Sequence, residues 1–297
     1  MKAIDLFSGW GGFTLGAEQA GVEVVWAGNH SKIAVEAHQM NHPNTLHVCQ
    51  DLRQADWSLL PDYDLLLASP ACQGHSPASQ PQRHAYHDAL RATAWAVVDC
   101  ADATEPSTIV VENVPSFRRW RLYPAWKHAL EIMGYRLEER FLTASHYGTP
   151  QRRKRLFLFA TKETLDLDLV PGLEPAIGEH IEWGADVPWR KITNSSHNVQ
   201  ARIAKGRRNH GNSFITQHVT GHPGIGLDEP IRTITTKDQY ALVYEDHYRP
   251  LTVRETARAM GFPDSYRWPT HATRKEQIRG LGNAVCPPLA RRIVAEL

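Results

Sequence analysis

The chain has 297 residues, with 33 Lys and Arg against 32 Asp and Glu, and a formal net charge of +1 at pH 7. Hydrophobic residues make up 42% and charged residues 22%, which excludes a disordered or collagen-like chain and is typical of a globular protein with a large core. No apolar run approaches the roughly 20 residues that cross a bilayer, and the N-terminal segment lacks the apolar stretch of a signal peptide. We therefore expect a cytoplasmic, monomeric protein with no membrane partner.

Cysteine and histidine spacing argues against disulfides and metals. Four widely spaced cysteines form no CxxC pair, so neither a disulfide framework nor a structural zinc site is expected. The sixteen histidines are scattered, and we predict no metal. Basic residues gather at 117–121, 151–155 and 205–208. Such clusters are typical either of a solvated surface or of a contact with nucleic acid.

Over the first 160 residues, short apolar stretches alternate with helical patterns. The predicted strands are Lys2–Leu6, Val22–Ala27, Tyr63–Ala68, Ser107–Val111 and Arg155–Ala160. The predicted helices are Thr14–Ala20, Ile33–Asn41, His87–Ala101 and Ala125–Met133. This alternation implies right-handed crossovers, and hence an α/β fold with a doubly wound, mostly parallel sheet.

The composition changes after residue 161. Residues 162–248 are rich in Gly, Pro, Asn and His, with strand-like pieces at Phe214–His218 and Ile231–Thr236. This stretch predicts a smaller unit of irregular and β structure. We divide the chain into 1–161, 162–248 and 249–297.

The last segment, 249–297, begins with a helix signal. Thr252 can cap a helix, Glu255 stands at the capping-box position, and Gly261 is a stop signal. A Gly-Asn turn and a closing helix from Pro287 follow. We expect this segment to pack back onto the first domain.

A glycine-rich loop, Asp5-Leu-Phe-Ser-Gly-Trp-Gly-Gly12, separates the first strand from the first helix. Glycines there let the backbone approach a ligand in front of the helix N-terminus, which predicts a site for a nucleoside cofactor. The loop lacks the GxGxxG spacing of dinucleotide-binding folds, which argues against a dehydrogenase. A plain strand-to-helix turn is the alternative interpretation.

Three further sequence blocks carry polar or reactive side chains. Two of them follow predicted strands, and the third leads into one. Ser69-Pro-Ala-Cys-Gln-Gly-His-Ser76 places a thiol at the carboxyl end of a buried strand, although a lone cysteine is commonly a small buried hydrophobe. Glu112-Asn-Val-Pro115 places a carboxylate at the same edge, and Tyr147-Gly-Thr-Pro-Gln-Arg-Arg-Lys-Arg155 precedes another strand. We expect a thiol, a carboxylate and two arginines to converge above one sheet.

In this order, the blocks resemble those of the DNA (cytosine-5) methyltransferases nearly end to end. The matching blocks are DLFSGWGGFTLG at 5–16, SPACQGHS at 69–76, ENVP at 112–115, QRRKR at 151–155, LTVRETARAMGFP at 251–263 and GLGNAVCPPLA at 280–290. The variable stretch falls where that family keeps its target recognition domain, including DEPIRTITT at 228–236. The resemblance implies a Rossmann-like class I methyltransferase fold that acts on double-stranded DNA in a restriction–modification setting.

The resemblance also implies catalytic roles. The Cys72 thiolate would add to C6 of a flipped-out cytosine, Glu112 would hold or protonate N3, and Arg155 with Arg153 would contact the base oxygen and nearby phosphates. The residues expected to contact the substrate are Gln73, Ser76, Asn113, Val114 and Gln151, with Lys205, Arg207 and Arg208 as phosphate contacts. A mobile solvated loop is the alternative for the last three.

The cofactor implied is S-adenosylmethionine. The residues expected to hold it are Phe7, Ser8, Gly9, Trp10, Gly12, Asn29, His30, Asp51, Leu52, Pro70, Asn283, Ala284 and Val285. Packing alone is an alternative for Trp10, and a backbone contact alone for Ala284.

Three residues, at two places in the chain, depart from the family pattern. Ala71 replaces the usual proline before the nucleophile, a mild change in loop stiffness, and His30 and Lys32 stand where the family usually has acids beside the cofactor ribose. A cationic wall there would favour a carboxylated derivative of S-adenosylmethionine and a carboxymethyl product. A tRNA cytosine-5 methyltransferase and a catalytically silent DNA-binding protein on the same fold are also compatible with the sequence.

Overall fold

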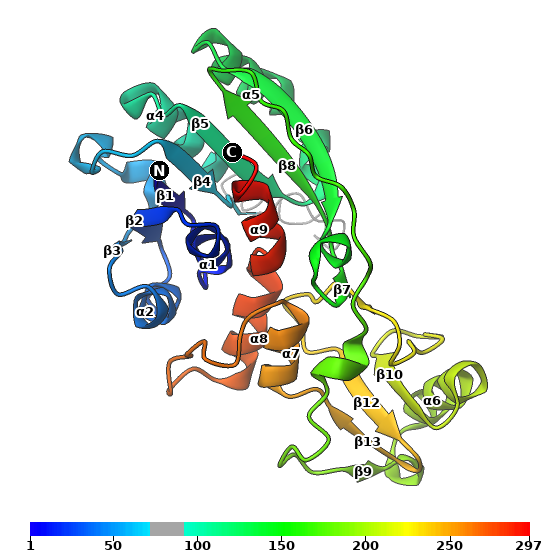
Figure 1. The fold of residues 1–297 in the computed structure, drawn as a ribbon. Helices are drawn as coiled ribbons and strands as arrows, with labels where there is room; N and C mark the ends of the chain where they lie inside the picture. The colour runs from blue at the N-terminus through cyan, green and yellow to red at the C-terminus, as the bar shows by residue number, and fades with distance from the viewer. Residues whose placement is uncertain (72–91) are drawn as a thin grey trace.

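A seven-stranded sheet forms the centre of the larger part of the molecule (Figure 1), a computed structural model that describes residues 1–71 and 92–297. The strand order is β3-β2-β1-β4-β5-β8-β6. The strands are β1 Lys2–Leu6, β2 Glu23–Asn29, β3 Leu46–Cys49, β4 Leu65–Ala68, β5 Thr108–Asn113, β6 Arg136–Thr143 and β8 Lys154–Thr161. The helices beside it are α1 Gly12–Gln19, α2 Lys32–Asn41, α4 Trp95–Thr104 and α5 Tyr123–Ile132.

The first five strands are parallel, whereas β8 runs antiparallel to both β5 and β6. The α/β class and the mostly parallel sheet are therefore confirmed. Strand β6, whose charged sequence hides its apolar positions, was not predicted. The predicted helix His87–Ala101 is found from Trp95 onward, and its part before residue 92 lies outside the described residues.

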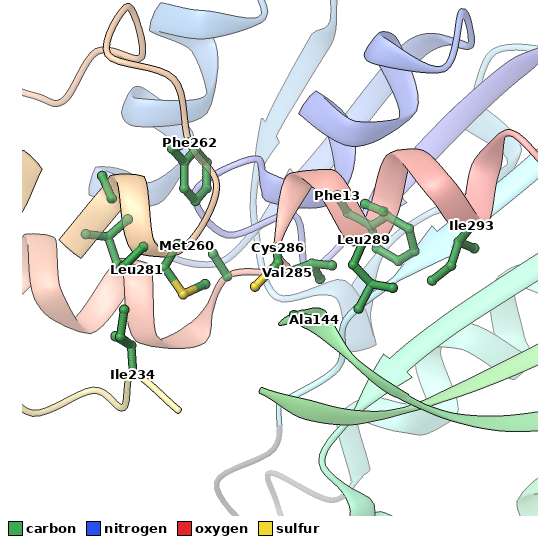
Figure 2. Packing of buried hydrophobic residues seen from close by; sticks show 14 of the residues in the cluster. Phe13, Ala144, Ile234, Met260, Phe262, Leu281, Val285, Cys286, Leu289 and Ile293 are labelled. Carbon is green, nitrogen blue, oxygen red and sulfur yellow. The ribbon is translucent and has the colours of Figure 1, made fainter. Parts of the chain in front are cut away.

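Each face of the sheet carries its own core because side chains alternate along a strand. Leu65 and Leu67 of β4 belong to one hydrophobic cluster, and Leu66 to the other. The first cluster includes Phe13 of α1 and Leu289 of the C-terminal helix α9, Pro287–Val294, which Figure 2 shows against each other. This double coverage explains the uninterrupted apolar run of β4.

A second, smaller sheet lies at the other end of the molecule, in the order β10-β12-β13-β9. Its strands are β9 Arg190–Lys191, β10 Ser213–Gln217, β12 Tyr240–Tyr244 and β13 His247–Pro250. Helix α6, His197–His210, packs on β10. This helix corrects the expectation of only irregular and β structure; its sequence is too polar to show the apolar face of an amphipathic helix. Strand β13 crosses the predicted boundary at residue 248.

The two sheets are joined by the parallel pair β7, Gln151–Arg152, and β11, Ile231–Arg232. Helices α7, Val253–Ala259, and α8, Arg274–Asn283, follow the second sheet and lead to α9. The predicted capping box of Thr252 and Glu255 is confirmed. Helix α8 was not predicted, and the Gly-Asn pair expected to form a turn lies at its end.

The C-terminal helix α9 packs on α1. Gly16 of α1 makes this close approach possible, because a Cβ there would lie 2.4 Å from Cβ of Ala290. Among residues 1–71 and 92–297, no helix is long and apolar enough to cross a membrane.

Candidate active site

The predicted carboxylate and arginine meet where β5 ends and β8 begins. Because β8 is antiparallel to β5, its first residues lie beside the last residues of β5, and Glu112 pairs in register with Phe157. Nε of Arg155 lies 3.0 Å from Oε1 of Glu112. Two blocks more than forty positions apart in the chain are thus joined by strand direction alone.

The Glu112–Arg155 pair is well buried, with side-chain exposures of 8% and 13% respectively. Burial raises the pKa of Glu112, and the positive charges of Arg155 and Arg153 oppose that shift only in part. Nε of Arg155 is the ion-pair partner of Oε1, and the other described residues donate no hydrogen bond to this oxygen. A buried carboxyl group with a raised pKa can accept a proton from a ligand or supply one to it.

The next strand of the sheet brings the predicted nucleophile loop to the same edge. Asn113 Nδ2 donates to the carbonyl oxygen of Pro70 at 3.0 Å, and its Oδ1 accepts from the Val114 amide at 2.9 Å. Asn113 therefore ties the block after β5 to the loop after β4. Cys72, Gln73 and Ser76 lie outside the described residues.

Arg153 and Gln151, which were expected to contact the substrate, form hydrogen bonds with backbone groups of segments far along the chain. The buried Arg153 guanidinium donates to the carbonyl oxygens of Ile234 and Gly282, each at 3.0 Å. The Gln151 amide accepts from the Ile234 amide at 2.6 Å and donates to the Ala259 carbonyl at 3.2 Å. Both side chains join the large sheet to the second unit and to the C-terminal segment, contacts that no sequence spacing could reveal.

The glycine-rich loop is shaped by backbone conformations that ordinary residues rarely adopt. Phe7 and Gly9 have φ of 61° and 55°. The Ser8 amide donates to the Gly28 carbonyl at 3.2 Å, which holds the loop over the end of β2. A Cβ on Gly12 would lie 2.1 Å from the Val285 carbonyl oxygen. The first and last family blocks are therefore in direct contact.

Trp10 has a packing role. It is 4% exposed, its ring centroid lies 4.9 Å from that of Trp268, and Gly280 packs against its indole. Ala284 and Val285 are also buried, whereas Asn283 is exposed. Among these predicted cofactor residues, only Asn283 presents a side chain to solvent.

The ends of β2 and β3 supply the other predicted cofactor residues. Asn29 Oδ1 accepts from the Ser31 amide at 2.9 Å, and Leu52 packs beneath Gly28. Asp51 is held by Arg53, whose Nε donates to Oδ1 at 3.0 Å and thereby lowers the pKa of that carboxyl. His30 and Lys32 are exposed.

A buried polar network below the loop was not predicted. Thr14 Oγ1 donates to Asp5 Oδ2 at 2.8 Å and lies 3.0 Å from His38 Nε2, while His38 Nδ1 lies 2.8 Å from His47 Nε2. A neutral His38 must therefore donate from Nε2 to Thr14 and accept from His47 at Nδ1. The available signal was the i, i+4 spacing of His38 and His42, the residue that follows α2, whose ring centroids lie 4.5 Å apart.

The predicted phosphate contacts of the second unit lie on α6, which excludes a mobile loop for them. Lys205 Nζ donates to the Gly221 carbonyl at 2.8 Å, and Arg207 donates to the Glu245 carbonyl. Arg208 is exposed. Two of the three cations thus also hold neighbouring loops.

The mostly parallel sheet with helices beside it is the fold of the class I S-adenosylmethionine-dependent methyltransferases, and solved methyltransferase structures share it. The family model for C-5 cytosine-specific DNA methylases matches residues 1–226 and 179–297. The chain belongs to this family.

Individual relatives cover almost the whole chain. Type II methyltransferase M.NlaX of Neisseria lactamica is 29% identical over 314 residues, covering 100% of this chain and 96% of that protein. M.HhaI of Haemophilus parahaemolyticus is 25% identical over 309 residues, covering 96% and 90%. Among solved structures, a prophage-encoded Escherichia coli protein has a TM-score of 0.74 at 22% identity, covering 100% of this chain and 98% of that one. The Dnmt2 methyltransferase of Schizosaccharomyces pombe has a TM-score of 0.70 at 19% identity, covering 99% and 97%.

Proposed function

We propose that this protein methylates C5 of a cytosine flipped out of duplex DNA, through a covalent bond between Cys72 and C6 of the base. The observation that carries the proposal is the buried Glu112–Arg155 pair, which Asn113 ties to the loop that leads to Cys72. Membership of the C-5 cytosine-specific DNA methylase family supports it.

Cytosine is a poor carbon nucleophile, so the ring must first be activated. The Cys72 thiolate forms a bond to C6, while Glu112, whose pKa burial raises, donates a proton to N3 and so accepts the charge that the ring gains. In this proposal, Arg155 donates to the base oxygen beside N3. C5 then has the character of an enamine carbon.

When bound, S-adenosylmethionine supplies an electrophilic methyl group for C5. After transfer, a water molecule takes the C5 proton, the C5–H electron pair restores the ring double bond, and the C6–S bond breaks to return the thiolate. N3 gives its proton back to Glu112. Every group of the protein then regains its starting protonation state.

The residues around the glycine-rich loop fit a nucleoside cofactor. The half-buried Gly9 has only the Phe7 carbonyl oxygen within 4 Å of an added Cβ, at 3.8 Å, and Ser69 Oγ at the adjacent strand end is buried without a hydrogen-bond partner among the described residues. We propose that Phe7, Ser8 and Gly9 form one wall of the site. Asn29, Asp51 and Leu52 form the nucleoside side, with Pro70 between them and the base.

We propose Arg153 and Gln151 as positioning residues. Their hydrogen bonds hold the segment around Ile234 and the end of α8 against the large sheet. Residues 162–248 would read the DNA, so these bonds would align the reading domain with the Glu112–Arg155 pair.

The test supplies duplex DNA and isotopically labelled S-adenosylmethionine, then identifies the modified nucleoside by mass. We expect 5-methylcytosine, and a duplex with 5-fluorocytosine at the target should trap an adduct on Cys72, because fluorine cannot leave as a proton does. Label in tRNA alone would support an RNA methyltransferase, and absence of product in both would contradict an enzyme of this kind.

The same measurement tests which group is transferred. His30 and Lys32 are exposed at the start of α2, and the positive charge of His30 is the smallest of the influences that lower the pKa of Asp51. Wild type and His30→Glu are each given S-adenosylmethionine and its carboxylated derivative in competition. The mass of the modified cytosine then shows whether a methyl or a carboxymethyl group was transferred. Methylcytosine as the sole product with the carboxylated compound in excess would end the carboxymethyl hypothesis.

A further inference from the structure

Helix α6 and the loop that follows β10 lie in the second unit (Figure 1), and basic side chains gather on them and on β11. We define the cluster as Arg202, Lys205, His218, His222 and Arg232. Lys205 Nζ bonds to the Gly221 carbonyl, and Asn209 Nδ2 donates to the Pro223 carbonyl at 2.9 Å. The loop is therefore held along the helix, close to the cluster.

His222 supplies the cluster with a buried N–H group. The ring is 2% exposed, and its Nδ1 accepts from the Gly224 amide at 3.1 Å. Burial, followed by the charges of Arg232 and Arg202, lowers the pKa of His222 to about 4, so the ring is neutral at pH 7. Because Nδ1 accepts, the single proton is on Nε2, which has no partner among the described residues.

Arg202 supplies a second such group. The residue is 9% exposed, and its Nε donates to Thr216 Oγ1 at 3.0 Å. Its Nη2 is buried and lacks a partner in the described part of the chain. Burial lowers the pKa of Arg202, but a guanidinium remains charged at neutral pH.

The charges that act on His222 all have the same sign. They come from Arg232, Arg202, His210 and Lys205. The acid Asp238 acts on His218, whose pKa it raises against the larger effects of burial and Arg202. Like charges repel, and buried N–H groups without acceptors cost free energy. An anion with several oxygen acceptors would relieve both costs.

We propose that Arg202 and His222 form the floor of a binding site for one backbone phosphate of the DNA, with the exposed Arg232 and Lys205 at its rim. This rests on the proposed function, since it names the contact by which the second unit would hold its substrate. A phosphate is favoured over a base edge because the groups that act on His222 are all cationic, and such contacts position DNA without reading its sequence.

The test measures binding of a fluorescein-labelled duplex by anisotropy over a series of salt concentrations. Arg202→Met should weaken binding about tenfold and reduce the slope of log affinity against log salt by about 0.9, the loss of one phosphate contact. His222→Phe should weaken binding about as much but leave the slope unchanged, because the ring it replaces is neutral. Both effects should be the same on duplexes of unrelated sequence.

Arg136→Met is the matched control, because it makes the same change in an exposed arginine at the far end of β6. It should leave binding and slope unchanged. The melting temperature without DNA separates binding from structure: His222→Phe removes an N–H group without a partner but also the acceptor of the Gly224 amide, so it should lower the melting temperature only slightly while binding falls about tenfold. Variants that melt lower but bind DNA as tightly as wild type would show an internal structural cluster and overturn the proposal. Failure of the wild type itself to bind duplex DNA would instead contradict the proposed function.

Discussion

Replacing Asp5 by Asn should change how stability depends on pH. Asp5 is fully buried at the end of β1, where Thr14 donates to Oδ2 and Oδ1 has no partner among the described residues. Burial raises the pKa of Asp5 from 3.8 to about 7, against the smaller opposing effect of the Thr14 hydrogen bond. Folding therefore takes up a proton at Asp5 throughout the range between these two values.

Because folding takes up this proton, the free energy of unfolding should fall as the pH rises. The stability that Asp5 contributes is fully present below pH 3.8, falls as the pH rises through about 7, and then stays constant because the carboxyl is ionised in both states. One pKa unit corresponds to about 1.4 kcal/mol, so between about pH 5 and pH 8 the wild type should lose roughly 3 kcal/mol of free energy of unfolding through this residue. The amide of Asp5→Asn does not titrate and should not show this loss.

The assay is urea unfolding followed by tryptophan fluorescence at several pH values, for wild type and Asp5→Asn. The difference between the two curves isolates Asp5, because contributions common to both proteins cancel. One of these contributions comes from His38. Burial, and then the charges of His42 and His47, lower the pKa of His38, so its contribution to the free energy of unfolding falls as the pH falls. Glu23→Gln, which removes an exposed carboxylate, controls for net charge. A difference between the curves that does not change with pH would refute the reasoning.

Three further predictions concern the proposed reaction and the link between the two units. Cys72→Ser should abolish methyl transfer while DNA binding persists in gel shifts, because a hydroxyl is far less acidic than a thiol; retained turnover would remove Cys72 from the mechanism. Glu112→Gln should slow single-turnover methylation by about 10²–10⁴-fold, since the amide keeps an oxygen near Arg155 but cannot give up a proton; an unchanged rate would contradict general-acid assistance. Arg249→Met should lower the free energy of unfolding by about 3–5 kcal/mol, because it leaves the fully buried Glu255 carboxylate without its partner at 2.7 Å. Adding Glu255→Gln should recover part of that loss, and no recovery would show that the ion pair is not the cause.

Local sequence signals were sufficient for much of the large domain. The apolar run of β4, the glycine-rich loop after β1 and the capping box at Thr252 each depend on residues that are neighbours in the chain, so pattern and spacing predict them. The order of the family blocks likewise placed Glu112 and Arg155 at one sheet edge. The family match along the whole chain agrees with that interpretation.

Tertiary structure decided what those residues contact. The antiparallel direction of β8 brings Arg155 to Glu112, and the end of α8 meets Arg153 through a backbone hydrogen bond between residues far apart in the chain. The network from Asp5 to His47 and the cluster of Arg202 and His222 also join segments that no periodicity connects. A sequence pattern reports which face of an element is apolar, but the partner of a buried polar group is set by long-range packing. Polar contacts between distant segments therefore emerge only when the whole chain is folded.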